Sequence, residues 1–329
     1  TTIRGGGGAP ATEISTTLRE RLTPDEIRRV ATAHTRDVDA YQFYPALINS
    51  HARLTYTEVA AILANTRGPD AAKRPDLVPH LLAHWVLNAS DRWLIERYRG
   101  TSAVGIYVAS YAFIDGVNLL AASMNRAWVP LFTRSFADPA QRSTIARGIT
   151  YFVLVVASVS TSLVVLSPSL VRLFFAPAYV EAAQIAPILA LGGLAQGLYY
   201  VYVTVLFFHA RNGILPVVTV IAGTLNIVLN ILWLPTYGIA GAAWATLLGY
   251  VVLMLGVRWA SLRVAKLPFE VRRLAKLAAV CAMTMLCGGG LDFALTGWTE
   301  LGAKLALIAV GAGVLVALGF FSPEELRAL

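Results

Sequence analysis

The sequence predicts an all-α integral membrane protein with about eight transmembrane helices, preceded by a small mixed soluble segment. Hydrophobic residues make up 57% of the chain and charged residues only 14%, whereas soluble domains are about 25% charged. The charges are also unevenly placed. Residues 1–76 hold ten Lys and Arg and nine Asp and Glu, whereas residues 77–329 hold seventeen and ten over more than three times the length. The net charge of +8 therefore belongs mainly to the membrane portion, which favours loops facing a cytoplasm and anionic lipid over nucleic-acid binding.

The soluble segment, residues 1–76, predicts two short helices and a strand but no complete core. A capping box at Thr23 begins the first helix, and the aromatic and branched residues of 41–48 favour a strand. Thr55 or Thr57 caps the second helix. The glycine-rich start is expected to be flexible, and so short a segment is marginal for independent folding.

Apolar runs predict the spans, because a helix needs about 20 apolar residues to cross the hydrocarbon core. The predicted spans are 77–95, 103–125, 148–171, 182–210, two within 212–257, 275–293 and 305–323. The two spans within 212–257 are separated by a turn at Pro235 and Gly238. The first two spans are amphipathic.

Alternate connections between the spans carry unequal numbers of Lys and Arg. One set holds twelve: Arg126, Arg134, Arg142, Arg147, Arg211, Arg258, Arg263, Lys266, Arg272, Arg273, Lys276 and Arg327. The opposite set holds five: Arg92, Arg97, Arg99, Arg172 and Lys304. Positive residues accumulate on the cytoplasmic side, so both termini are expected there. Three of the five exceptions lie in one charged stretch, which forms either an exposed loop or a group turned into an aqueous cavity.

Polar residues inside the spans are further candidates. Asp115 and Asn118 lie in the second span, where a charge is costly unless it meets water or a partner. Asp115 could be a cation or proton site, could pair with Arg126, or could simply face a cavity. Asn226 and Asn230 lie four apart on one helix face, where we favour hydrogen bonds between helices over ligand contact.

The stretch "FYPALINSHARLTYTEVAAILAN", residues 43–65, resembles the catalytic domain of ribonuclease R and ribonuclease II enzymes. The resemblance extends over about residues 38–83 and implies a magnesium-dependent exoribonuclease. That activity needs several converging carboxylates upstream of this stretch. Only Asp25, Asp37 and Asp39 are available there, without the required spacing, so no RNA cleavage is expected.

The membrane portion resembles a different family. The stretches "WVLNASDRWLIERYRGTSAVGIY", "APAYVEAAQIAPILAL" and "NIVLNILWLPTYGIAGAAWATLLGY" are similar to the polysaccharide and lipid-linked-oligosaccharide flippases of the multidrug/oligosaccharidyl-lipid/polysaccharide exporter superfamily. The last stretch combines Asn226 and Asn230 with a turn and with small residues such as Gly241, which allow close helix packing.

The flippase resemblance implies two six-helix lobes, commonly followed by two extra helices. Residues 77–267 would then be the second lobe and residues 268–329 the extra pair with a short tail, with the ribonuclease-like segment in place of the first lobe. The chain is expected to be a chimera or fragment, or else a fusion with a purpose. A transporter made from it would be incomplete.

The same resemblance implies a central basic cavity for the pyrophosphate and first sugars of a polyprenyl-linked glycan. Arg92, Arg97 and Arg99 are the candidate head-group contacts, because arginine binds phosphate through a bidentate fork. The alternative is a solvated loop in which Asp91 and Glu96 are their local partners. Candidates for the cavity or for ion coupling are Asp91, Asp115 and Asn118. Candidates for helix packing are Asn226, Asn230 and Gly241.

The sequence therefore predicts a transporter in a bacterial cytoplasmic membrane that moves a lipid-linked oligosaccharide or polysaccharide precursor for the cell envelope, as in lipopolysaccharide synthesis. Its expected partners are the polyprenyl-pyrophosphate-linked glycan, membrane lipids and envelope glycosyltransferases. No enzymatic activity, cofactor or metal is expected, because "GGGG" lacks the Lys-Ser/Thr of a phosphate loop and no ligands are spaced around the histidines. The alternative is a membrane-tethered exoribonuclease fragment without its catalytic aspartates.

Overall fold

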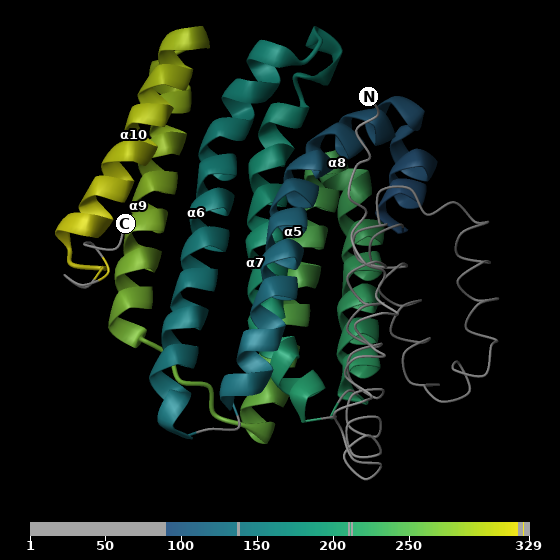
Figure 1. Cartoon of the computed structure of the whole chain (residues 1–329). Helices are drawn as coiled ribbons and strands as arrows, with labels where there is room; N and C mark the ends of the chain where they lie inside the picture. Colours follow the sequence, from purple (N-terminus) through teal and green to yellow (C-terminus); the bar gives the residue numbers. More distant parts are fainter. Residues whose placement is uncertain (1–89, 137–138, 210, 212, 322–324, 326–329) are drawn as a thin grey trace, which may run out of the picture. The chain divides into compact units, whose positions relative to one another are not determined.

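The computed structural model describes residues 90–136, 139–209, 211, 213–321 and 325 (Figure 1). The predicted soluble segment, with its two helices and its strand at 41–48, lies outside these residues, as does most of the first predicted span. Every regular element in the described part is helical. The long helices are α5 (Thr101–Phe136), α6 (Arg142–Phe174), α7 (Ala182–Phe208), α8 (Ile214–Val264), α9 (Val271–Ala294) and α10 (Gly297–Ala317). A helix over 90–99 precedes α5, and short 3₁₀ turns stand at Pro139–Gln141 (η2) and Pro177–Tyr179 (η3).

Six of these helices are long and apolar enough to cross a membrane. They overlap all the spans predicted after residue 100, while the predicted total of eight also depends on residues that the structure does not describe. The predicted bounds of the last span, 305–323, are wrong, because a span defined by uncharged residues must begin after Lys304. The helix α10 begins earlier, at Gly297, and carries Lys304 fully buried inside it.

The 51-residue helix α8 is folded back on itself at Gly238, where φ is 61° and ψ is −147°. A positive φ favours glycine, which has no Cβ to clash. Asn226 and Thr246 would lie about 30 Å apart along a straight helix. Asn226 Nδ2 instead donates a hydrogen bond to Thr246 Oγ1 over 3.4 Å. A Cβ on Gly256 would stand only 2.4 Å from Val218 Cγ1, so the two halves stay packed far from the turn.

The core lies around α7, which contacts α5, α6 and α8. Glycines permit this close packing: a Cβ on Gly193 would lie 2.9 Å from Val117 on α5, and one on Gly197 only 2.4 Å from Val156 on α6. The helices α9 and α10 contact one another and α6 (Figure 1). The protein therefore has a tightly packed group of helices, α5 to α8, and a C-terminal pair attached through α6.

Candidate functional site

The candidate functional site is built around Asp91, whose side chain is fully buried. Its Oδ2 accepts hydrogen bonds from the Tyr107 hydroxyl, over 2.8 Å, and from Thr246 Oγ1, over 2.6 Å. Its Oδ1 accepts one from Asn230 Nδ2, also over 2.8 Å. These donors come from α5 and from both halves of α8. One carboxylate thus joins the helix over 90–99 to the α8 hairpin and to α5.

A second layer of polar groups supports these donors. Asn226 lies one turn before Asn230, and Asn230 Nδ2 also donates to the Asn226 carbonyl oxygen over 3.0 Å. The hydroxyls of Tyr107 and Thr246 are 2.9 Å apart, and all four side chains are buried. Folding α8 back at Gly238 is what brings the residues before the turn against Thr246. We call Asp91, Tyr107, Asn226, Asn230 and Thr246 the Asp91 network.

The Asp91 network stabilises a carboxylate with neutral dipoles rather than with a cation. No Lys, Arg or His of the described chain forms an ion pair with Asp91. Asn230 Oδ1 is buried and accepts no hydrogen bond from any described group. Carboxylate, amide and hydroxyl oxygens suit a proton or a hard cation. No three His, Cys, Asp or Glu residues converge as metal ligands within the ranges given above.

Arg92 follows Asp91 but turns toward another neighbour, because consecutive helical residues point about 100° apart. Its guanidinium carbon lies 5.4 Å from the centre of the Tyr111 ring, and its buried Nε has no hydrogen-bond acceptor within the described part. The Asp91 oxygens are turned to the network and not to Arg92. The local Asp91–Arg92 pair considered from the sequence is therefore absent from the described contacts.

Asp115 and Asn118 follow Tyr111 at helical spacing on α5, so they share one side of that helix. Asp115 is half-buried and close enough to Arg92 to be attracted electrostatically. Asn118 Nδ2 donates to Gln196 Oε1 on α7 over 2.7 Å, while Asn118 Oδ1 is buried without a donor from the described residues. A second group of polar side chains thus lies beside the Asp91 network: Arg92, Asp115 and Asn118.

The other two arginines of the charged stretch, Arg97 and Arg99, lie apart from this group. Arg99 donates to the carbonyl oxygens of Leu234, over 3.0 and 3.2 Å, and of Pro235, over 3.0 Å. These carbonyls belong to the end of the first half of α8, next to Gly238, so Arg99 closes the α8 turn. Arg97 is exposed to solvent. Only Arg92, of the three head-group candidates, touches the polar interior.

Gly241, expected to favour close packing, stands just after the α8 turn. A Cβ there would lie 2.8 Å from the Trp233 carbonyl oxygen, so a larger residue would push the two halves apart. Arg126, offered by the sequence as a partner for Asp115, donates instead to Ser123 on its own helix over 2.8 Å.

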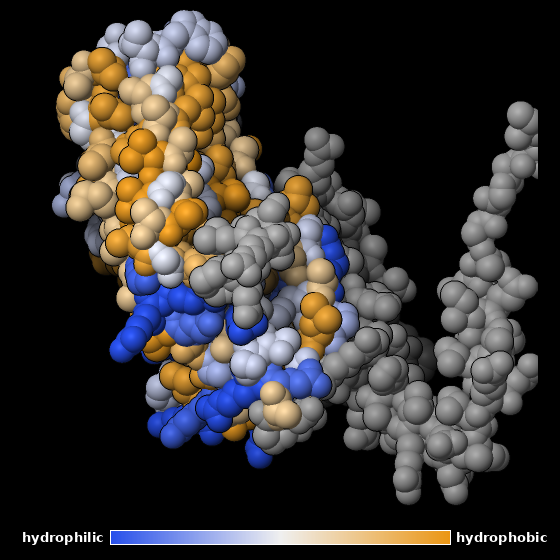
Figure 2. All heavy atoms as spheres, turned by 60° about the vertical axis from the view of Figure 1, so that its left-hand side comes forward, coloured by the Kyte–Doolittle hydropathy of each residue, from blue (hydrophilic) through white to orange (hydrophobic). Residues whose placement is uncertain are grey.

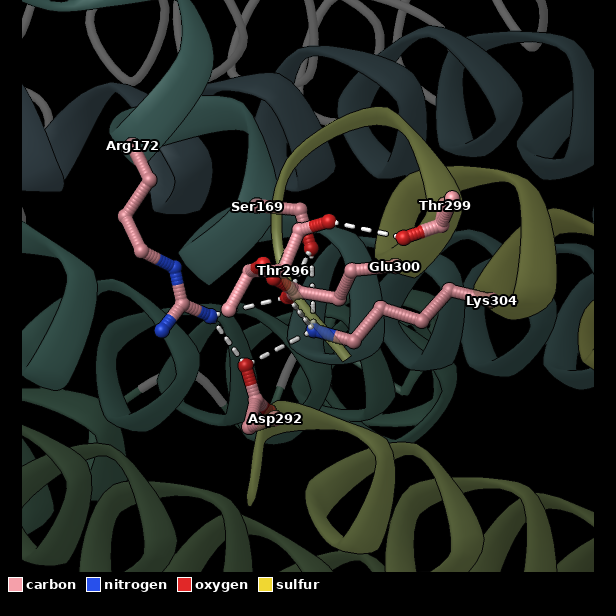
Figure 3. A network of polar contacts seen from close by, with 7 residues as sticks. All are labelled: Ser169, Arg172, Asp292, Thr296, Thr299, Glu300 and Lys304. Atoms are coloured by element: carbon pink, nitrogen blue, oxygen red, sulfur yellow. Dashed lines mark hydrogen bonds and ion pairs between the residues drawn. The ribbon is translucent and has the colours of Figure 1, made fainter. Parts of the chain in front are cut away.

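A second charged cluster, which sequence reasoning missed, joins the C-terminal helices to α6 (Figure 3). Lys304 Nζ lies 2.8 Å from both Asp292 Oδ1 and Glu300 Oε1. Arg172 pairs with the same two carboxylates, at 2.9 Å from Glu300, and closes a ring of four alternating charges. Ser169 donates to Glu300 and accepts from Lys304. We call Arg172, Asp292, Glu300 and Lys304 the charge ring.

The charge ring corrects the assignment of Lys304 and Arg172 to an ordinary connection. Lys304 is fully buried, and Arg172 belongs to the last turn of α6. The i, i+4 spacing of Glu300 and Lys304 was a usable signal, because such residues meet on a helix surface. The residues missed in the Asp91 network, Tyr107 and Thr246, had no comparable signal, since their meeting depends on the fold.

Six long apolar helices with buried polar and charged groups between them define a multi-pass helical membrane protein. The comparison with known proteins supports the same general class, a membrane protein. The uncharacterized membrane protein MJ1068 of Methanocaldococcus jannaschii is 23% identical over 166 residues, which is 50% of this chain and 32% of that protein. The match thus spans about a third of the relative's length. No family model and no solved structure matches the chain. The flippase and ribonuclease resemblances therefore stay predictions.

Proposed function

We propose that this chain is part of a transporter that moves a lipid-linked oligosaccharide or polysaccharide precursor across the cytoplasmic membrane. The observation that supports this best is Asp91, a buried carboxylate in a membrane protein without a counter-ion among the described residues. Ionisable residues at membrane depth are costly and mark ion or substrate pathways when they are not simply paired. In this proposal, Asp91 takes up and releases the coupling ion.

Coupling to substrate would run through the helix over 90–99. Asp91 and Arg92 are neighbours on that helix, so a displacement caused by occupancy at Asp91 also moves Arg92. A pyrophosphate in a low-dielectric cavity needs a fixed cation, and arginine offers several donors in a rigid fork. The unpartnered Nε of Arg92 is one such donor. Asp115 would hold Arg92 in place by electrostatic attraction while the cavity is empty.

A binding experiment tests the head-group part of this proposal. The purified full chain in detergent is titrated with farnesyl pyrophosphate, and the thermal unfolding midpoint is followed. We expect a saturable rise for the wild type and a loss of about tenfold in affinity for Arg92→Gln, since hydrogen bonds to charged groups contribute about 1.5–3 kcal/mol. Arg126→Gln is the matched control, because Arg126 is exposed and donates only to Ser123 in the described contacts.

Transport itself is tested in liposomes that hold the chain and a fluorescent lipid-linked oligosaccharide. Protein-dependent movement of the label to the opposite leaflet, lost on Arg92→Gln and kept on Arg126→Gln, would support the proposal. Equal binding and equal movement in both variants would overturn the role of Arg92. No binding of the pyrophosphate by the wild type would overturn the substrate class.

A further inference from the structure

The connection between α8 and α9 carries an unusual number of basic residues. Six lie between positions 258 and 276: Arg258, Arg263, Lys266, Arg272, Arg273 and Lys276. Clusters of this size beside a membrane span attract anionic lipid head groups. The contacts of each basic side chain show whether it is bound within the protein or is available to a lipid.

Two of the six are held by side chains. Arg258 Nη1 donates to the Tyr202 hydroxyl over 3.0 Å. Arg273 lies 3.1 Å from Glu270 and 2.7 Å from Glu325, so both of those carboxylates are already engaged. These interactions tie the connection to α7 and to the chain after α10. The two acidic residues nearest to the connection are thereby removed as partners for the remaining bases.

A third base is also used within the protein. Lys276 Nζ donates to the Leu318 carbonyl oxygen over 2.5 Å, which satisfies a free carbonyl at the end of α10. Arg263, Lys266 and Arg272 remain. All three are exposed, and none forms a hydrogen bond or ion pair with another residue of the described chain. We call these three residues the basic strip.

Apolar side chains stand beside the basic strip. The Arg263 guanidinium carbon lies 3.9 Å from the centre of the Trp259 ring, and Trp259 is 52% exposed. Leu262 and Val271 are exposed as well. Figure 2 shows hydrophilic residues gathered toward one end of the described helices, next to a hydrophobic surface. Tryptophan with arginine at the end of a span is typical of the membrane interface.

We propose that the basic strip binds the head groups of anionic phospholipids in the adjacent leaflet. The cations match the phosphate of a lipid such as phosphatidylglycerol, whose head group has no positive charge to cancel it, while Trp259 and Leu262 lie against the upper part of its acyl chains. A soluble polyanion would match the cations alone and would leave the apolar residues without a role. This inference does not depend on what the protein transports.

The test uses the full chain purified in mild detergent and incubated with equal amounts of phosphatidylglycerol and phosphatidylcholine that have matched acyl chains. Native mass spectrometry counts the lipids that remain bound. The wild type is expected to retain phosphatidylglycerol preferentially. The variant Arg263→Gln/Lys266→Gln/Arg272→Gln is expected to lose that preference by about tenfold or more, since each base near a membrane surface contributes about fivefold to lipid binding.

The matched control is Arg142→Gln/Arg147→Gln/Arg211→Gln, which removes three exposed bases that the charge distribution places on the same membrane side. Retention of the lipid preference by this control supports a localised strip. Equal losses in both triple variants would mean that only the overall charge matters, and an unchanged preference in the first would mean no lipid site at all. Either result would overturn the proposal. If the first triple variant is not recovered folded, Arg272→Gln alone is compared with Arg142→Gln in the same assay.

Discussion

The Asp91 network and the charge ring both place carboxylates inside a membrane protein, but they stabilise them in opposite ways. In the charge ring, Asp292 and Glu300 each meet both Arg172 and Lys304, so the charges cancel. In the Asp91 network, a single carboxylate is held by hydroxyl and amide donors without a described counter-ion. A closed ring has no need of an exchangeable ion, whereas the proposed function assigns such an ion to the lone carboxylate. On the proposed function, the comparison separates a structural role from a functional one.

The largest effect is expected from opening the charge ring. Lys304→Met leaves the buried Glu300 and its neighbour Asp292 with only Arg172 between them. Removing one partner of a buried ion pair costs about 3–5 kcal/mol. We expect Lys304→Met to lower the free energy of unfolding by about that amount, measured by denaturant unfolding in detergent. Lys304→Met/Glu300→Gln should recover part of the loss, and an equal loss in both would show that charge balance is not what the ring provides.

A different response is expected from the lone carboxylate. If Asp91 holds an exchangeable cation, sodium should raise the unfolding midpoint of the wild type relative to choline, because a ligand that binds only the folded state stabilises it. Saturating ion at about 100 times its dissociation constant would contribute about 2.7 kcal/mol. Asp91→Asn should abolish the sodium effect. Asp292→Asn is the control: it weakens the charge ring, yet it should leave the sodium effect in place.

Removing a neutral donor of the Asp91 network should have a smaller effect on stability than removing the carboxylate itself. Thr246→Val removes the donor nearest to Asp91, at 2.6 Å, with little change of shape. Loss of a hydrogen bond to a charged group costs about 1.5–3 kcal/mol. Thr284→Val is matched, since Thr284 is also buried but donates to the Val280 carbonyl oxygen of its own helix. A smaller loss of unfolding free energy for Thr246→Val than for Thr284→Val would argue against an ionised Asp91.

The sequence predicted the helical spans well because each is an uncharged or nearly uncharged run, and hydrophobic length is a local property. It also predicted the turn within α8, since Pro235 and Gly238 interrupt such a run. It missed the charge ring because the same rule treats Lys304 as the edge of a span. A buried charge is compatible with a span when its partners come from other helices, and those partners are set by the fold.

For the candidate site too, the sequence indicates some of the residues, but the fold determines their contacts. Asn226 and Asn230 could be singled out because polar residues are rare in apolar segments, and Asp91 because it belongs to the charged stretch. The contact among these three side chains could not be predicted, because it depends on the reversal of α8 at Gly238 and on the position of the helix over 90–99. Nothing in the sequence singles out Tyr107 or Thr246. Their role becomes visible only when Asp91 lies between them.

The smallest effect on the unfolding free energy is expected at Arg99, a charge that is stabilised in a third way. Arg99 meets neither a carboxylate nor a side-chain dipole in the described contacts, only the carbonyl oxygens of Leu234 and Pro235. Because this side chain is exposed, water can replace those contacts, and Arg99→Gln should lower the unfolding free energy by about 0.5–1.5 kcal/mol. Arg97→Gln is the exposed control. Loss of farnesyl pyrophosphate binding on Arg99→Gln, with unchanged stability, would instead return Arg99 to the head-group site and move that site toward the α8 turn.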